Sequence, residues 1–197
     1  GLARERLKQF NNAIGSYRKL AAQHAASRHV PQANFQLGML LYEAGDMAGA
    51  RAALKAVWDL EQHDLRPNAG YYLAWVSLGE KKLADAAKQF GGISEQFPEH
   101  QLAADARLQQ AIVLGAAEEH AQAQQALELF LKAHPKHEMT GQVYYQLGSA
   151  LMEQRQWPAA IAQFANVPAK NDWRDDALYR SAWCERRADN KLKAIPL

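Results

Sequence analysis

The stretch Phe35–Val57, FQLGMLLYEAGDMAGARAALKAV, contains the pattern that decides the fold. Its first half places apolar residues such as Leu37 and Leu41 at helical spacing. Gly45 then interrupts the pattern, and Leu54 belongs to the apolar stripe of a second helix. The stretch therefore predicts two amphipathic helices joined by a short turn.

This pair of helices returns along the chain with a period near 37 residues. An alanine stands near the start of each second helix, and its copies are separated by 36, 37 and 37 residues at Ala50, Ala86, Ala123 and Ala160. The same spacing extends back to Ala13 and forward to Ala194, where the last interval shortens to 34 residues. A fixed period of this length is typical of a solenoid, in which each repeat covers the apolar face of its neighbour.

The period divides the chain into a half repeat, four full repeats and an incomplete repeat. We predict their boundaries at residues 1–30, about 31–66, 67–103, 104–140, 141–174 and 175–197. Residues 192–197 begin a second helix that is not completed, and neither end reads as a polar capping repeat. We therefore expect one solenoid domain over residues 1–197 that is a section of a longer array, or whose ends pair with another copy.

Alanine is the most unusual feature of the composition, with 38 copies among 197 residues. It is the best helix former and is too small to fill a core by itself. Small residues recur where the two helices of one repeat must approach closely, namely at Gly38, Ala74, Ala111 and Gly148. A larger apolar residue four positions after each recurring alanine is expected to fill the space between neighbours: Leu54, Phe90, Leu127 and Phe164.

The overall composition excludes several classes of protein. Lys and Arg number 23 against 21 Asp and Glu, so a formal net charge of +2 gives no reason to expect a nucleic-acid partner. The single cysteine, Cys184, rules out an internal disulfide and a cysteine-based metal site. No apolar run approaches the length of a membrane span.

Motifs that carry catalytic chemistry are absent from the sequence. There is no glycine-rich phosphate loop, no GxSxG elbow and no HExxH pair. His134 and His137 are the closest histidines but lack a third ligand, so we interpret them as solvated loop residues. Cys184 lies beside Trp183 within a helical pattern and is interpreted as a packing residue. We therefore predict that the protein is not an enzyme and binds no cofactor or metal.

The repeat resembles the tetratricopeptide repeat (TPR). That family favours Leu-Gly at positions seven and eight, Gly at fifteen, Ala at twenty, Phe at twenty-four and Pro at thirty-two. The matching residues, repeat by repeat, are Leu37, Gly38, Gly45 and Ala50; Ala86, Phe90 and Pro98; Ala123 and Pro135; and Leu147, Gly148, Ala160 and Phe164. The resemblance covers nearly the whole chain and implies an all-α fold, a right-handed superhelical solenoid of antiparallel helix pairs.

The sequence departs from the family in a consistent way. The period is about three residues longer than the usual 34, and Lys81, Glu118 and Arg155 stand where the turn glycine is expected. The added length falls near residues 97–104 and 134–138. Such stretched loops are similar to those of bacterial cell-envelope TPR proteins, of the outer-membrane assembly lipoprotein and Tol-Pal accessory types. This likeness favours the periplasm or cell envelope slightly over the cytoplasm.

In the TPR family the first helices line a concave groove, and positions two, five, nine and twelve of each repeat face into it. Members that bind chaperones hold a carboxylate with Lys and Asn at positions five and nine, and this chain has no such pair. Its row is aromatic and apolar, which is typical of a partner-binding surface. The residues predicted to bind a protein or peptide are Phe35, Met39, Tyr42, Tyr71, Trp75, Leu78, Leu108, Ile112, Tyr145, Met152, Tyr179 and Trp183.

We therefore predict a non-enzymatic scaffold that holds a peptide or partner segment in this groove. Packing between helices also explains Tyr42, Tyr71 and Tyr145, whereas Trp75 occupies a position that usually carries a small polar residue. Two other roles stay open. One is a structural or self-assembling section of a longer array, and the other is an arm that presents substrates to a catalytic domain.

Overall fold

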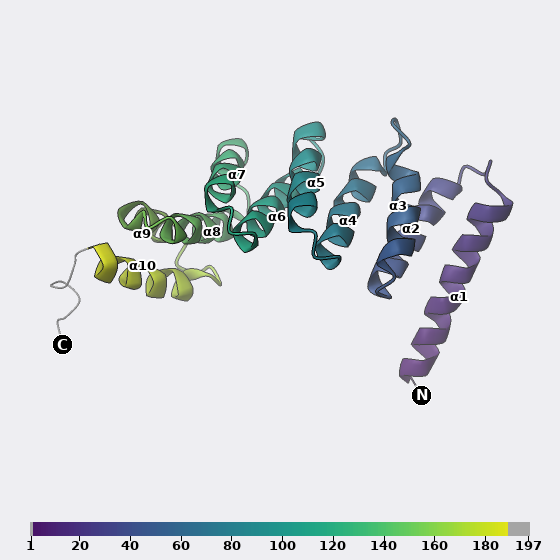
Figure 1. Ribbon diagram of the computed structural model, residues 1–197, viewed down its shortest axis with the longest axis horizontal. Coiled ribbons are helices and arrows are strands. Elements are labelled where there is room, and N and C mark those ends of the chain that lie inside the picture. The colour runs from purple at the N-terminus through teal and green to yellow at the C-terminus, as the bar shows by residue number, and fades with distance from the viewer. Residues whose placement is uncertain (1, 189–197) are drawn as a thin grey trace. The chain divides into compact units, whose positions relative to one another are not determined.

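The computed structural model describes residues 2–188, with side chains from residue 9 onward (Figure 1). Over this range it contains ten α-helices and no strand, which confirms the predicted all-α fold. The helices are α1 (Leu2–Gln23), α2 (Val30–Glu43), α3 (Met47–Trp58), α4 (Arg66–Gly79), α5 (Leu83–Gln96), α6 (Ala103–Ala116), α7 (His120–Ala133), α8 (Thr140–Glu153), α9 (Trp157–Ala165) and α10 (Arg174–Ala188).

Each of the four predicted full repeats contains one pair of these helices. The first helices, α2, α4, α6 and α8, begin one residue before the predicted repeat boundaries, as does α10. The second helices are α3, α5, α7 and α9. Residues 192–197, where an unfinished second helix is expected, lie outside the described residues.

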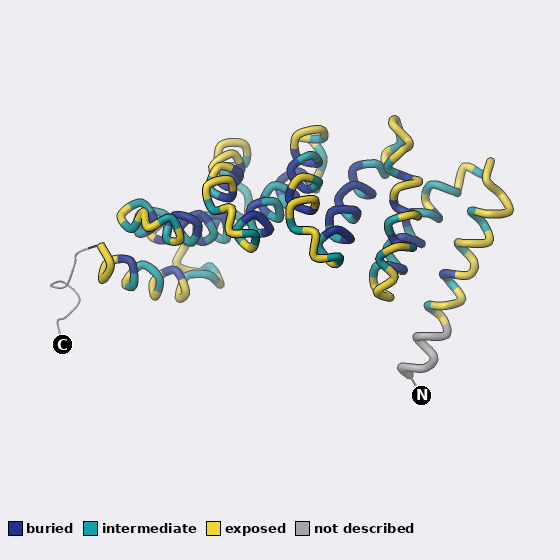
Figure 2. The backbone as a smooth tube through the Cα atoms, in the orientation of Figure 1, coloured by how far each residue is buried: buried dark blue, intermediate teal, exposed yellow. Residues whose placement is uncertain are grey.

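Contacts divide the chain into two compact units, Gly1–Ala103 and Ala104–Leu197. In the first unit, consecutive helices from α1 to α5 pack against one another. In the second, α7 to α10 do the same, and α6 shares one apolar core with them. Figure 2 shows that within each unit the buried residues follow one side of a helix and the exposed residues the other.

The cores are built from the stripes that the sequence predicts. In the first unit Leu54 of α3 and Phe90 of α5 are fully buried. In the second unit Leu127 of α7 and Phe164 of α9 are almost completely buried. The recurring alanines are also buried, with exposures of 0 to 2% at Ala50, Ala86, Ala123 and Ala160. The repeat alanines are therefore contact points between helices, as predicted.

Glycines at position eight allow the two helices of a repeat to approach closely. A Cβ atom added to Gly38 would lie 2.5 Å from Cγ of Leu54, and one added to Gly148 would lie 2.6 Å from Cδ1 of Phe164. Atoms do not approach so closely in packed interiors, so these glycines leave room for the buried side chain opposite.

Every full repeat turns between its helices on one residue in the left-handed conformation. Gly45 has φ of 80°, and the three residues that replace the turn glycine have φ near 60°, namely Lys81, Glu118 and Arg155. In the second repeat the Lys81 N–H donates to the carbonyl of Leu78 at 2.9 Å. The next N–H, of Lys82, donates to the carbonyl five residues earlier, also at 2.9 Å. These bonds close the end of the helix, so the turn survives the loss of glycine.

A second recurring turn precedes the first helices, and the sequence analysis did not predict it. His63, His100 and His137 each accept the N–H two residues ahead at Nδ1, over 3.1, 3.2 and 3.3 Å. Asn171 accepts the Trp173 N–H at Oδ1 over 3.0 Å in the same way. The four positions are 37, 37 and 34 residues apart. His137 is therefore a structural turn residue, which the interpretation as a solvated loop histidine did not include.

Candidate functional site

The predicted binding residues differ widely in how much of each side chain is exposed. At position five, side chains of the four full repeats are buried in their units: Phe35, Tyr71, Leu108 and Tyr145. Tyr179, at the same position of the incomplete repeat, is 74% exposed. The remaining predicted residues are half-buried: Met39, Tyr42, Trp75, Leu78, Ile112, Met152 and Trp183. Position five thus belongs mainly to the core, and positions nine and twelve to the accessible surface.

In the first unit, the position-nine residue Trp75 joins an aromatic cluster. Its ring meets Phe90 of α5 edge to face at a centroid distance of 5.4 Å and Tyr71 at 6.2 Å. Tyr71 in turn meets Phe90 at 5.4 Å. The half-buried Trp75 therefore contributes to packing, although its position in the repeat favoured the groove.

In the second unit, several predicted residues meet at a hollow between α8 and α10. The hollow has a volume of about 290 Å³. We call it the α8–α10 hollow, and it is lined by Tyr145, Met152, Asp176, Tyr179, Arg180 and Trp183. Four of these are residues that the sequence analysis predicted to bind a partner. They come from positions five and twelve of one repeat and five and nine of the next, so the repeat register brings them together.

Two other tryptophans hold the walls of this hollow. Trp173 stacks on Tyr145 with ring centroids 4.8 Å apart. Trp157, the first residue of α9, meets Trp183 edge to face at 5.5 Å. Neither Trp157 nor Trp173 was predicted from the sequence as a site residue, because both lie outside the inward positions of the repeat. These ring contacts support the aromatic walls of the hollow.

The hollow combines aromatic rings with charges of both signs. The Arg180 guanidinium lies 5.3 Å from the Tyr145 ring centroid, and Arg187 lies 4.8 Å from the Trp183 ring. Both are cation–π contacts. Asp176 supplies a carboxylate to the lining. Such a surface suits a partner segment that has both apolar and polar groups.

Cys184 lies close to the hollow in sequence but does not line it. The thiol is buried, and burial raises its pKa. A thiol that is buried and kept protonated is a poor nucleophile. The finding agrees with the predicted role as a packing residue.

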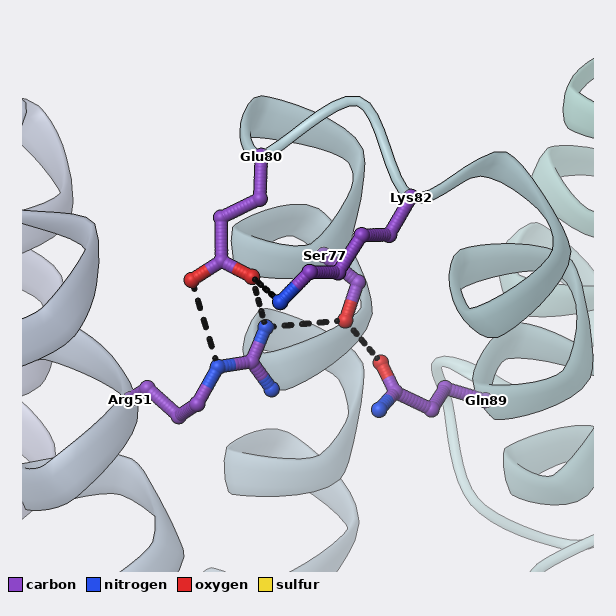
Figure 3. Close-up of polar contacts among 5 residues, drawn as sticks. All are labelled: Arg51, Ser77, Glu80, Lys82 and Gln89. Atoms are coloured by element: carbon purple, nitrogen blue, oxygen red, sulfur yellow. Dashed lines mark hydrogen bonds and ion pairs between the residues drawn. The ribbon is translucent and has the colours of Figure 1, made fainter.

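A polar cluster in the first unit joins three helices (Figure 3). Arg51 of α3 donates from its guanidinium to Glu80 over 2.8 and 3.3 Å and to Ser77 Oγ over 3.1 Å. Ser77 Oγ donates to Gln89 of α5 over 2.8 Å, and Lys82 Nζ lies 2.7 Å from the Glu80 carboxylate. Hydrogen bonds from Arg51 and then Lys82 lower the pKa of Glu80 to about 2.

The second unit has a neutral counterpart of this cluster. Gln154 donates from Nε2 to Oε1 of Gln124 over 2.9 Å. Gln124 and Gln154 stand at the same repeat positions, twenty-one and fourteen, as Arg51 and Glu80. This recurrence indicates that polar contacts at these two positions join neighbouring repeats in both units.

A further hollow of about 460 Å³ lies in the first unit. Trp58, Gly70, Leu73 and Ile93 contribute apolar groups to it, and α5 adds Gly92 and four polar side chains, Asp85, Lys88, Gln89 and Gln96. None of the predicted binding residues lines it. We therefore take the α8–α10 hollow as the candidate site.

Residues 2–188 hold no group of three or more His, Cys, Asp or Glu side chains arranged to bind a metal ion. None of the described helices combines the length and the apolar character needed to cross a membrane.

Solved structures with the same fold have low sequence identity to the chain. YrrB, described as a TPR protein with an unusual peptide-binding site, has a TM-score of 0.69 at 18% identity, covering 91% of this chain and 87% of YrrB. MamA from Desulfovibrio magneticus RS-1 has a TM-score of 0.65 at 18% identity, covering 81% and 86%. The apo form of RapI has a TM-score of 0.74 at 16% identity, covering 95% and 56%. These similarities show the TPR fold.

Family models divide the chain near the end of its first full repeat. A tetratricopeptide-repeat model matches residues 1–60. The model of the outer membrane lipoprotein family YfiO matches residues 63–187, which is more than half of the chain. A search of curated proteins found no significant match. The paired helices, the recurring turns and these two matches together show that the chain is a TPR protein and belongs to the YfiO family of outer membrane lipoproteins.

Proposed function

We propose that the protein is a non-enzymatic scaffold that binds a segment of a partner protein on its first helices. The α8–α10 hollow carries this proposal, because four of its six lining residues stand at repeat positions that face the groove in the TPR family. Tyr and Trp contribute strongly to protein interfaces, and Met152 adds a side chain that adapts to different partners. YrrB, with the same fold, is described as having a peptide-binding site.

The accessible rim of the hollow is the part that can meet a partner. Tyr179 exposes 74% of its surface, and Trp183 and Met152 are half-buried. Tyr145 lies beneath them, buried and stacked on Trp173. We propose that a partner residue inserts between Tyr179 and Met152 and that the buried ring supports the floor.

Substitution of Tyr179 tests this function. Peptides selected from a phage-displayed library of random 12-residue sequences serve as the probe, and their Kd is measured by fluorescence anisotropy. We expect Tyr179→Ala to weaken binding about 10- to 30-fold, as for a tyrosine at the centre of an interface. Leu178→Ala is the matched control, because Leu178 is 52% exposed on the same helix but does not line the hollow. Equal Kd values for the wild type and Tyr179→Ala would show that the peptides do not bind in the hollow.

We also propose that the protein works in the bacterial cell envelope. The description of its family as outer membrane lipoproteins supports this location, as do the stretched loops between repeats. Fractionation of the source cells, followed by detection with an antibody to this chain, tests the location. Recovery of the protein in the cytoplasmic fraction alone would contradict it.

A further inference from the structure

The row of residues at position twelve has a gap in the second unit. Tyr42, Leu78 and Met152 occupy this position in three full repeats, whereas α6 has Gly115. Glycine inside a helix is less favourable than alanine. Packing among the described residues does not require it here, because a Cβ atom added to Gly115 would meet none of their other atoms within 4 Å.

The missing side chain leaves a hollow between α6 and α8. Its volume is about 210 Å³, and we call it the Gly115 hollow. Apolar groups from α6, α7 and α8 line it, including Ile112, Ala123, Leu127 and Ala150. Its polar groups are His120, Gln146, Ser149 and Glu153. Ser149 is already engaged, because its hydroxyl donates to the carbonyl of Tyr145 over 2.9 Å.

The first unit shows what fills the equivalent space. There the position-twelve residue is Tyr42, and its Cε2 atom lies 3.8 Å from where a Cβ atom on Gly79 would stand. Met47 closes the same space, with Cε at 3.0 Å from that point. In the second unit the residues at these three positions are Gly115, His120 and Glu153. A large side chain is thus replaced by an open space, and two of its neighbours change from methionine and glycine to histidine and glutamate.

We propose that the Gly115 hollow receives a lysine or arginine side chain from the partner segment. This inference rests on the proposed binding function and identifies one residue of the ligand. The aliphatic stem of a basic side chain would lie along Ile112 and Ala116, which line the hollow and are at least partly accessible, as such stems do on apolar surfaces. Its charged end would meet Glu153 at the rim. Among the described residues, no ion pair engages Glu153, so its carboxylate is available for a charge-assisted hydrogen bond.

The position of the hollow agrees with the candidate site. Ile112 was itself predicted to bind a partner, and the Gly115 hollow and the α8–α10 hollow both take residues from α8. A segment lying across α8 would therefore place one residue near Tyr179 and another near Gly115. The two contacts can be removed separately.

Substitutions at Gly115 test whether the hollow is occupied. The probe is the set of peptides selected on the wild-type chain from the random 12-residue library. We expect Gly115→Tyr, which restores the residue present in the first repeat, to weaken their binding at least 10-fold. Gly115→Ala is the control, because one methyl group leaves most of the hollow open, and we expect less than a 3-fold change. Circular dichroism verifies that both variants remain helical.

A charge test identifies the class of side chain. In each selected peptide the basic residue is replaced by norleucine, which keeps an apolar stem and removes the charge. We expect this change to weaken binding of the peptide to the wild-type chain at least 10-fold. Binding of the peptide to the Glu153→Gln variant, which has lost the carboxylate, should change less than 3-fold. Selected peptides that lack a required basic residue, or that bind Gly115→Tyr with unchanged Kd, would overturn the inference.

The outcomes separate this inference from the proposed function. Binding that depends on Tyr179 but not on Gly115 or Glu153 would leave the scaffold function in place and overturn the basic-residue site. Failure to select any peptide that binds the wild-type chain would count against both.

Discussion

At the scale of single residues, the left-handed turns show how the fold tolerates unfavourable sequence. Lys81, Glu118 and Arg155 adopt φ near 60° where Gly45 stands in the first full repeat. A residue with a Cβ atom is strained in this conformation by about 1 to 2 kcal/mol. The turn persists because two backbone hydrogen bonds close the preceding helix and because the apolar stripes on both sides must meet.

Replacing Arg155 by glycine should therefore stabilise the protein. Relief of the strain exceeds the extra entropy that glycine loses on folding, which is about 0.5 to 1 kcal/mol. We expect Arg155→Gly to raise the free energy of unfolding by about 0.5 to 1 kcal/mol, measured by urea denaturation. Arg155→Ala keeps the Cβ atom and should change little. A loss of stability in the glycine variant would show that the arginine side chain has a structural role.

Some of the turns and close contacts of the fold could be predicted from the sequence, and others could not. The sequence showed that three repeats lack the turn glycine, and it showed the row of small residues at position eight. The histidine turns were not predicted, because His134 and His137 are neighbours in sequence, whereas His63, His100 and His137 are related only as equivalent repeat positions. The hollow at Gly115 could have been predicted, because the sequence has a glycine at a position where the other full repeats have a large residue.

At the scale of helices, the repeat register was predictable and the contacts between repeats were not. The stripe that contains Leu54 and Phe90 predicted which helix faces are buried, because apolar periodicity determines them. The pairing of Arg51 with Glu80 was not evident, since the two residues are 29 positions apart and lie in different repeats. Only packing of α3 against α4 brings their side chains together.

The Glu80 cluster makes the stability of the first unit depend on pH. The ordinary pKa of Glu80 is 4.5, and the folded protein lowers it to about 2. The deprotonated form is therefore favoured by folding, so the contribution of Glu80 is fully present above pH 4.5 and is lost as the pH falls toward 2.

Comparison of the wild type with Glu80→Gln tests this dependence. Urea unfolding at pH 7, 4 and 2.5 gives the stability difference between the two proteins. We expect the wild type to be more stable at pH 7 and the difference to shrink steadily toward pH 2.5. Because Glu80 is partly exposed, salt should reduce the difference at pH 7. A difference that does not vary with pH would mean that the carboxylate charge contributes nothing to folding.

At the scale of the whole molecule, contacts are mainly between neighbours along the chain. Two compact units result, each with its own apolar core around residues such as Leu54 and Phe164. In a repeat protein the total stability is approximately a sum of repeat terms and interface terms. Damage to one repeat should therefore remain largely local.

Substitution of Gly148 by alanine tests this locality. Alanine normally stabilises a helix relative to glycine, but here the new Cβ atom would lie 2.6 Å from the buried ring of Phe164. We expect the overpacking to destabilise the protein by about 1 to 3 kcal/mol. Gly92→Ala is the matched control, because Gly92 lies within α5 and its Cβ atom would meet only Gln96 Nε2, at 3.6 Å. That variant should be as stable as the wild type or more so.

Amide hydrogen exchange then shows where the destabilisation is felt. In Gly148→Ala, protection should fall most in α8 and α9, whose packing contains the new contact, and least in α2 to α4 of the first unit. Gly38→Ala, which crowds Leu54, should give the opposite distribution. An equal loss of protection in both units would show that the two unfold as one cooperative block. If the losses are local, the α8–α10 hollow can be altered in variants without loss of the first unit, and binding data from the second unit can be interpreted on their own.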